Sequence, residues 1–141
     1  MTYILALDQG TSSSRALVYD AAGSVVGSAQ QSIESTYPND GWVEQDPDMI
    51  WSSILTVGRQ AIAAANIEPA AVAGIGITNQ RETTLLWERE TSHTLYNAIV
   101  WQDRRSAAYC EDLAAQNYSA GQTDGQDVAA LIRQTTGLII D

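Results

Sequence analysis

The chain has 141 residues, 45% of them hydrophobic, and a formal net charge of −10 at pH 7. This length fits one domain with a buried core, and the apolar content favours a soluble globular chain over a disordered one. The strong negative charge argues against nucleic acid and anionic membrane surfaces as partners, because both are negatively charged themselves.

The first third of the chain predicts three successive strands. Apolar runs place them at Tyr3–Asp8, Arg15–Asp20 and Ser24–Ile33. The last two are joined by residues 20–23, Asp-Ala-Ala-Gly, which predict a tight hairpin turn with the glycine at positive φ. Residues 9–14, Gln-Gly-Thr-Ser-Ser-Ser, predict a polar turn between the first two strands.

This first turn is the most informative segment of the sequence. It combines a glycine with four hydroxyl residues and lies between Asp8 and Arg15. Backbone N–H groups and hydroxyls in such a turn suit an anion, above all phosphate. A carboxylate at the strand end suits a hydrated Mg²⁺ ion, which keeps most of its waters. The alternative is an Asx or ST turn that only closes a hairpin.

A loop and an amphipathic helix follow. Residues 34–45 contain Pro, Asn, Asp and Gly and predict a loop. Asp46 and Pro47 then predict a helix start, with the aspartate as N-cap and the proline in the first helical position. Apolar residues at helical spacing line one face, and Gly58 among them predicts a close approach by another element. Pro69 marks the end of the helical region.

The middle of the chain predicts three more strands, the first of them buried: Val72–Thr78, Thr83–Trp87 and Leu95–Trp101. Adjacent Arg81 and Glu82 offer the donors and the acceptor that a polyol hydroxyl needs, since each hydroxyl both donates and accepts. The alternative is a surface ion pair worth under ~1 kcal/mol.

Trp101 lies at the end of an apolar run and before a charged segment. An aromatic wall of this kind suits the carbon face of a sugar or polyol, and the alternative is a core tryptophan. Asp103 fits a helix N-cap and a catalytic carboxylate equally well. His93 lies in a polar turn, where we expect a solvated side chain.

The last third predicts two helices. Asp103–Gln116 has Ala107, Cys110, Leu113 and Ala114 on one side, so we expect the single cysteine to be a packing thiol. Asn117–Gly125 predicts a loop, and Asp127–Thr136 predicts a short helix that Gly137 ends. The apolar run Leu138–Asp141 predicts a strand.

Together these elements predict an α/β fold with a mixed sheet and flanking helices. A Rossmann start is excluded, because Arg15 begins a strand where that fold begins a helix. A P-loop is excluded, because no Gly-Lys-Ser/Thr is present. A glycine-hydroxyl turn between antiparallel strands is the phosphate-binding device of the actin-like ATPase (ribonuclease H-like) fold, which we therefore expect here.

Four blocks of the sequence, in one order, resemble the FGGY carbohydrate kinases and, within them, the glycerol kinases. They are residues 6–15 (Ala-Leu-Asp-Gln-Gly-Thr-Ser-Ser-Ser-Arg), 41–47 (Gly-Trp-Val-Glu-Gln-Asp-Pro), 76–84 (Gly-Ile-Thr-Asn-Gln-Arg-Glu-Thr-Thr) and 96–102 (Tyr-Asn-Ala-Ile-Val-Trp-Gln). The third block favours glycerol over xylulose and gluconate as the substrate. The resemblance implies ATP-dependent phosphorylation of glycerol to sn-glycerol 3-phosphate.

The resemblance also implies site residues. The ATP phosphates would be bound by Thr11, Ser12, Ser13 and Arg15, and Thr11 would also lie near the product phosphate. Asp8 would hold Mg²⁺ through water. Glycerol would be bound by the side chains of Arg81, Glu82 and Trp101.

The family is several times longer than this chain, so the resemblance implies the N-terminal part of the first kinase lobe, left incomplete. A further glycerol-binding tyrosine, the aspartate that acts as catalytic base and the adenine-binding lobe would lie beyond residue 141. We therefore expect the segment alone to be nearly inactive, with an apolar sheet edge that promotes self-association. A kinase for another polyol or sugar and a non-catalytic actin-like binding module remain alternatives.

The expected setting is the cytoplasm, because no basic leader with an apolar region opens the sequence and no apolar run approaches ~18 residues. The full-length form is expected to be a homo-oligomer, in line with the resemblance. Expected ligands are glycerol, ATP and Mg²⁺.

Overall fold

A computed structural model describes residues 2–115, 117–118 and 126–140 of the chain. The chain divides into two compact units, Met1–Gln102 and Asp103–Asp141.

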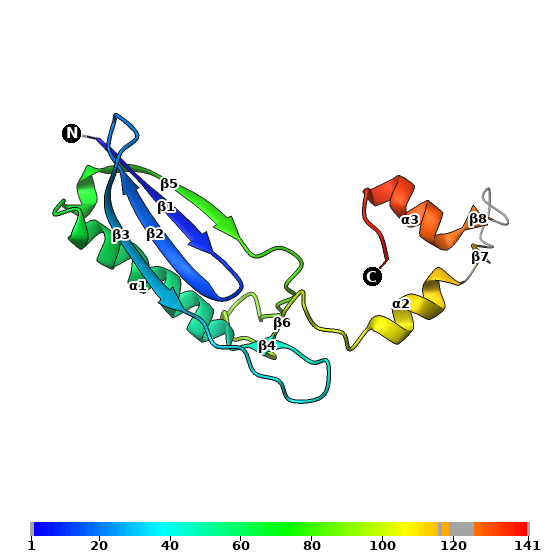
Figure 1. Cartoon of the computed structure of the whole chain (residues 1–141). Coiled ribbons are helices and arrows are strands. Elements are labelled where there is room, and N and C mark those ends of the chain that lie inside the picture. Colours follow the sequence, from blue (N-terminus) through cyan, green and yellow to red (C-terminus); the bar gives the residue numbers. More distant parts are fainter. Residues whose placement is uncertain (1, 116, 119–125, 141) are drawn as a thin grey trace. The chain divides into compact units, whose positions relative to one another are not determined.

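The first unit is built on a four-stranded sheet with the order β3-β2-β1-β5 (Figure 1). Its strands are β1 (Tyr3–Gln9), β2 (Ser13–Tyr19), β3 (Val25–Ser32) and β5 (Val72–Asn79). The first three run antiparallel in sequence order, and β5 runs parallel to β1. The mixed sheet and its three leading strands are therefore confirmed, with bounds shifted by one or two residues.

The hairpin turn between β2 and β3 forms as predicted. The Asp20 carboxylate accepts hydrogen bonds from the backbone N–H groups of Ala22 and Ser24, each at 2.9 Å. Gly23 adopts a φ of 79°, a conformation that costs glycine little because it has no Cβ. The sequence thus determines this turn locally.

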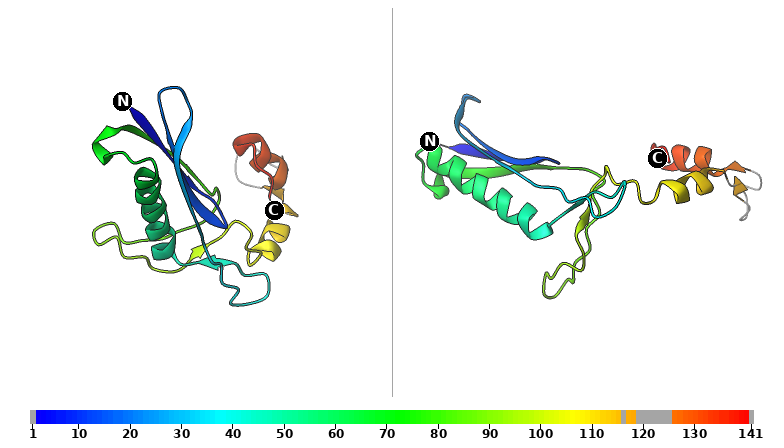
Figure 2. Two further views of the ribbon diagram at one scale, coloured as in Figure 1. Left: turned by 60° about the vertical axis from the view of Figure 1, so that its left-hand side comes forward. Right: turned by 60° about the horizontal axis from the view of Figure 1, so that its bottom comes forward.

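Helix α1 (Pro47–Ala64) packs on one face of the sheet, as the two views of Figure 2 show. It begins where the sequence predicts, because the Asp46 side chain accepts a hydrogen bond of 2.8 Å from the Asp48 N–H group. A short 3₁₀ helix, η1 (Pro69–Ala71), leads from the helix region into β5. The core between α1 and the sheet consists of Leu5, Ala16, Val18, Ile54, Val57 and Ala61.

Helix α1 and the sheet approach each other closely at Gly27 of β3. A Cβ there would clash with the Ala61 carbonyl oxygen and lie 2.6 Å from the Ala65 nitrogen. At Gly58, where the sequence predicts a close approach, an added Cβ would lie 3.5 Å from the Leu7 side chain, which is ordinary contact. The close contact between helix and sheet is therefore confirmed, but the glycine that permits it is Gly27 on the strand and not Gly58 on the helix.

Strand β5 lies at the edge of the sheet and is not buried, contrary to the prediction. Ile75 and Ile77 are 60% and 74% exposed. Their register partners Leu5 and Leu7 point toward α1, but the helix packs mainly over β1, β2 and β3. The apolar run predicted burial, but within the described residues no helix covers β5.

The two predicted strands Thr83–Trp87 and Leu95–Trp101 do not form as continuous strands. The segment holds isolated bridges, Thr84 to Ile99 and Trp87 to Thr94, and the short strand β6 (Ala98–Ile99). Strand β6 pairs with β4 (Glu44–Gln45), so the loop predicted for residues 34–45 ends in a strand. Exposed apolar side chains in this hairpin explain the short pairing, because a two-stranded ribbon without a covering layer is marginal.

The second unit holds helices α2 (Ala107–Ala114) and α3 (Val128–Thr136), with the strand pair β7 (Asn117–Tyr118) and β8 (Gln126–Asp127) between them in the sequence. The start of α3 is confirmed, because the Asp127 carboxylate accepts a hydrogen bond of 3.0 Å from the Ala129 N–H group. Its end is confirmed by Gly137, whose φ is 77°. The face predicted for α2 is the half-buried one, formed by Ala107, Cys110, Leu113 and Ala114.

In this unit, the predicted start of α2, the predicted loop and the predicted final strand differ from the structure. Helix α2 begins at Ala107, four residues later than predicted. Residues 117–118 form a strand where a loop was predicted, while residues 119–125 of that loop lie outside the described residues. Residues 138–140 form no strand. No helix among the described residues is long and apolar enough to cross a membrane.

Candidate functional site

The turn between β1 and β2 presents backbone donors. It is closed by a hydrogen bond of 2.9 Å from the Gly10 N–H group to the Ser13 carbonyl, and a Cβ at Gly10 would lie only 3.1 Å from that oxygen. The Ser12 carbonyl accepts from the Ile33 N–H group at 2.9 Å. Within the described residues, the N–H groups of Thr11 and Ser12 donate to no protein acceptor. This arrangement is suited to an anion.

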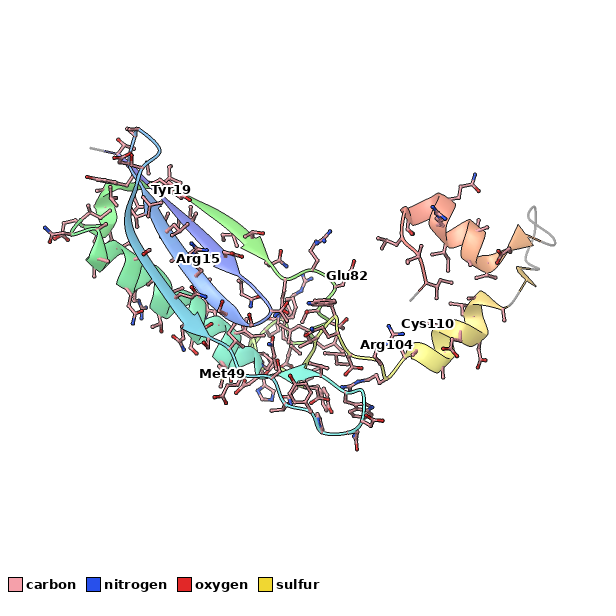
Figure 3. The ribbon with its side chains drawn as sticks, viewed as in Figure 1. Arg15, Tyr19, Met49, Glu82, Arg104 and Cys110 are labelled. Atoms are coloured by element: carbon pink, nitrogen blue, oxygen red, sulfur yellow. The ribbon has the colours of Figure 1, made fainter. Side chains whose placement is uncertain are left out.

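A cavity of about 310 Å³ opens beside this turn, on the sheet face opposite α1. Asp8 and Arg15 are register partners on β1 and β2, and Thr78 of β5 is the register partner of Asp8 on the other side. Paired residues share a face of the sheet, so the three polar side chains form one row across the cavity. Figure 3 labels Arg15 on β2. The cavity is lined by Ala6, Leu7, Asp8, Arg15, Leu17, Gly76, Ile77 and Thr78.

Asp8 fits a magnesium ion only in one coordination mode. Its side chain is exposed, and no group of three or more His, Cys, Asp or Glu residues suited to a metal occurs among residues 2–115, 117–118 and 126–140. A protein cage for a cation is therefore absent from this part of the chain. A single carboxylate beside an anion-binding turn suits Mg²⁺ that keeps its waters and is shared with phosphate oxygens.

The loop after β5 carries Arg81 and Glu82, both exposed. Glu82 is labelled in Figure 3. Within the described residues they form no ion pair with each other, which argues against the surface ion-pair alternative. Glu82 has a φ of 61°, in the left-handed region, where a residue with a Cβ is strained by roughly 1–2 kcal/mol. Strain at an exposed carboxylate favours a functional reading of this loop over a packing one.

Trp101 is not a core residue, since 52% of it is exposed. Its indole Nε1–H donates a hydrogen bond of 2.8 Å to the Thr11 hydroxyl. Trp101 and Thr11 are far apart in the sequence. The fold brings the aromatic side chain predicted to cover a polyol into contact with the turn predicted to bind phosphate. The core alternative for Trp101 is therefore excluded.

Gln45 connects the same turn to the loop that carries Arg81. Its side-chain nitrogen Nε2 donates to the Thr11 carbonyl at 2.7 Å and to the Ser35 hydroxyl at 3.0 Å. Its oxygen Oε1 accepts from Nε2 of Gln80 at 2.9 Å. Gln45 is fully buried. Its position in a polar loop without periodicity gives no sign of this role in the sequence.

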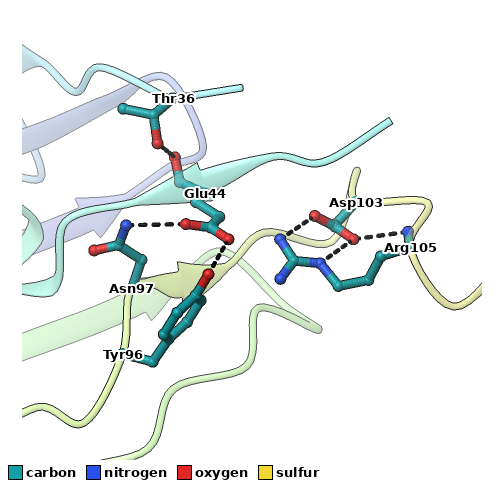
Figure 4. Close-up of polar contacts among 6 residues, drawn as sticks. All are labelled: Thr36, Glu44, Tyr96, Asn97, Asp103 and Arg105. Carbon is teal, nitrogen blue, oxygen red and sulfur yellow. Dashed lines mark hydrogen bonds and ion pairs between the residues drawn. The ribbon is translucent and has the colours of Figure 1, made fainter. Parts of the chain in front are cut away.

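Glu44 supports the segment that leads to Trp101. Its carboxylate is 2% exposed and accepts hydrogen bonds of 2.9 Å from the Tyr96 hydroxyl and from Nδ2 of Asn97 (Figure 4). The Thr36 hydroxyl donates to its carbonyl oxygen at 3.4 Å. The role of Glu44 was not predicted from the sequence. The only signal for it was its place in the Gly-Trp-Val-Glu-Gln-Asp-Pro block.

Three further residues were singled out in the sequence: Asp103, His93 and Cys110. The N-cap of α2 is Ser106, so the N-cap prediction for Asp103 is wrong. The Asp103 carboxylate, 3% exposed, instead forms an ion pair of 2.8 Å with Arg105, also drawn in Figure 4. His93 is exposed in its turn, as predicted, and Cys110 is half-buried on α2.

Comparison with protein families gives one match that spans most of the chain. Residues 3–134 match the N-terminal domain of the FGGY family of carbohydrate kinases. A glycerol kinase of Alkalilimnicola ehrlichii is 53% identical over 141 residues, which is 100% of this chain and 26% of that protein.

Two solved structures are similar over nearly the whole chain. A glycerol kinase of Plasmodium falciparum with ADP has a TM-score of 0.82 and 30% identity, over 100% of this chain and 26% of its own. A xylulose kinase of Brucella ovis has a TM-score of 0.81 and 31% identity, over 98% and 26%. The chain thus spans about a quarter of the length of the relatives it matches.

Proposed function

Because the chain belongs to the FGGY family of carbohydrate kinases, we propose that it is the phosphate- and glycerol-binding segment of a kinase that transfers the γ-phosphoryl group of ATP to glycerol. Its fold is the actin-like ATPase fold of that family. The products would be ADP and sn-glycerol 3-phosphate. Relatives named glycerol kinase that are about half identical over the whole segment support this choice of substrate.

The contact between Trp101 and Thr11 is the observation that carries the proposal. Phosphoryl transfer needs the acceptor hydroxyl beside the γ-phosphate, because catalysis is largely positioning and charge stabilisation. The hydrogen bond of 2.8 Å between the indole and the Thr11 hydroxyl joins a half-exposed aromatic side chain to the turn that we assign to phosphate. A polyol packed on that face would have a hydroxyl within reach of a phosphate held by the turn.

On the phosphate side, we assign the turn and the neighbouring strand. Thr11, Ser12 and Ser13 would bind phosphate oxygens through hydroxyl and backbone N–H donors, and Arg15 would add a planar fork of donors. Thr11 would also lie beside the phosphate of the product. Asp8 would hold Mg²⁺ through water, and this ion would neutralise charge on the phosphates during transfer.

On the polyol side, Arg81 would donate to glycerol oxygens and Glu82 would accept from glycerol hydroxyls. Each hydroxyl needs one donor and one acceptor, so adjacent residues of these two types satisfy both requirements. Trp101 would cover the carbon backbone and exclude water from that side. The φ of 61° at Glu82 supports a role for the loop beyond packing.

We assign no catalytic base to these 141 residues, and the proton of the attacking hydroxyl would pass to a carboxylate elsewhere in the full-length protein. The segment alone is expected to turn over far below the ~1–100 s⁻¹ typical of kinases. For the full-length protein we propose a homo-oligomer in the cytoplasm.

A substrate panel tests the proposal. The full-length gene product is assayed for ADP formation with glycerol, D-xylulose and D-gluconate, and product stereochemistry is read with a dehydrogenase specific for sn-glycerol 3-phosphate. We expect glycerol to be the preferred substrate by kcat/KM. The similarity to the Brucella ovis xylulose kinase makes a sugar kinase the second candidate. Preference for xylulose would establish that candidate instead, and ADP binding without any phosphorylation would support a binding module.

A further inference from the structure

The structure assigns to Gln45 the role of a positioning residue. It couples the turn proposed to bind phosphate (residues 9–14, the phosphate turn) to the loop proposed to bind glycerol (residues 80–83, the polyol loop). The inference rests on the proposed function, because it concerns the geometry of the same site. Its basis is a chain of hydrogen bonds that runs from the Thr11 carbonyl through the buried Gln45 amide to the half-buried Gln80 amide.

Burial gives these hydrogen bonds their weight. Gln45 is fully buried, so its amide cannot exchange protein partners for water. Both of its N–H donors are used, one by the Thr11 carbonyl and one by the Ser35 hydroxyl. An unsatisfied polar group at this position is costly, so the three segments are held in one arrangement.

The chain of bonds reaches both halves of the proposed site. At one end it holds the backbone of Thr11, whose hydroxyl also accepts from Trp101. At the other end it holds Gln80, the residue before Arg81, and the Oε1 atom of Gln80 accepts from the Thr83 hydroxyl at 3.1 Å. Residues 80–83 are thereby anchored on both sides of the Arg81-Glu82 pair. A shift of the turn is transmitted to the polyol loop, and the reverse also holds.

The remaining loop residues do not provide such a link. Arg81 and Glu82 are exposed and have no hydrogen bond to the turn among the described residues. Gln45 therefore helps to fix the distance between the acceptor hydroxyl and the phosphate, beside the hydrogen bond from Trp101 to the Thr11 hydroxyl. Misplacement of about 1 Å at a reacting centre lowers rates by up to about 100-fold.

Kinetics of the full-length protein test this role. In Gln45→Met, which keeps side-chain length but removes all three amide bonds, we expect kcat to fall about tenfold or more and KM to rise for both glycerol and ATP. In Gln80→Met, which breaks only the loop end, we expect KM to rise more for glycerol than for ATP, because Gln45 still holds the Thr11 carbonyl.

Ser53→Ala is the matched control. Ser53 is also fully buried, and its hydroxyl bonds Ser14 at 2.7 Å and the Ile50 carbonyl at 2.8 Å, between α1 and β2. This variant is expected to lower the melting temperature and to leave both KM values within ~2-fold of the parent. If Gln45→Met lowers the melting temperature but leaves both KM values within ~2-fold of the parent, as Ser53→Ala is expected to do, the positioning role is refuted.

A second readout does not depend on phosphorylation of glycerol. In NMR spectra of the full-length protein, Gln80→Met should shift the amide resonance of Thr11, and the same change made in a Gln45→Met background should not. A Thr11 shift of equal size in both backgrounds would overturn the coupling through Gln45. Absence of kinase activity in the parent protein with this pattern intact would instead refute the proposed function alone.

Discussion

Glu82 combines an exposed carboxylate with a left-handed backbone, at φ 61°. Glycine adopts this conformation without steric cost, so Glu82→Gly is expected to raise the free energy of unfolding of the chain by up to about 1 kcal/mol. In the full-length protein the same variant is expected to raise KM for glycerol, because an acceptor is lost. Chemical unfolding and initial rates measure the two effects.

Ser92→Gly is the control for this prediction. Ser92 is also exposed and has a φ of 59°, but it lies outside the proposed site. It should gain a similar stability without a change in KM for glycerol. A loss of stability in Glu82→Gly would mean that the Glu82 carboxylate supports the fold rather than a ligand.

Glu44 supplies a second prediction for a single residue. Its buried carboxylate accepts from two donors, Tyr96 and Asn97. In Glu44→Gln one acceptor oxygen becomes an NH₂ group that faces a donor, at a cost of about 1–3 kcal/mol in the free energy of unfolding. Urea unfolding measures this loss, and exposed Glu34→Gln is the control, expected to leave the midpoint unchanged. Equal midpoints for both variants would show that the two hydrogen bonds contribute nothing net.

Helix α1 and strand β3 approach each other at Gly27, and this contact between elements can be tested. In Gly27→Ala the new Cβ meets the backbone of α1 at Ala61 and Ala65, which cannot move as a side chain can. We expect a loss of about 1–3 kcal/mol in the free energy of unfolding, measured by urea unfolding. Gly76→Ala, with open space around the added Cβ, should change it by less than ~1 kcal/mol. Equal losses in the two variants would contradict the close helix–strand contact.

Elements with local signals could be predicted from the sequence. Asp46 and Pro47 determined the start of α1, and Gly23 and Gly137 marked two turns, because caps and positive φ depend on residues nearby in the chain. The hairpin after β5 was overpredicted for the same reason. Its residues have strand propensity, but whether a ladder extends depends on what covers it.

The outer strand β5 has a consequence for the molecule as a whole. Ile75 and Ile77 are largely exposed on the edge strand, and an apolar edge is a template for pairing with another chain. Ile77→Lys is expected to increase the monomer fraction of the 141-residue chain in sedimentation velocity. Ile139→Lys, at a side chain of nearly equal exposure outside any strand, should leave that fraction unchanged. A parent chain that stays monomeric at high concentration would contradict this prediction.

At the site, the sequence predicted the residues of the turn, the loop and the aromatic wall, but not how they are joined. Thr11, Arg81 and Trp101 lie in separate blocks, and only the folded chain brings Thr11 against the Trp101 indole. Gln45 and Glu44 could not be assigned from their types, because polar residues in a loop are usually solvated. Their burial depends on β4 pairing with β6, which lies far away in the sequence.

In the proposed site, the Gln80–Glu82 loop binds glycerol while the turn after β1 binds phosphate. The most direct measurement compares KM for glycerol with KM for ATP in full-length Arg81→Ala, with exposed Arg89→Ala as the control. We predict that KM for glycerol rises about tenfold to a hundredfold, as expected for a lost charged donor, while KM for ATP stays the same. An unchanged KM for glycerol in Arg81→Ala would contradict the claim.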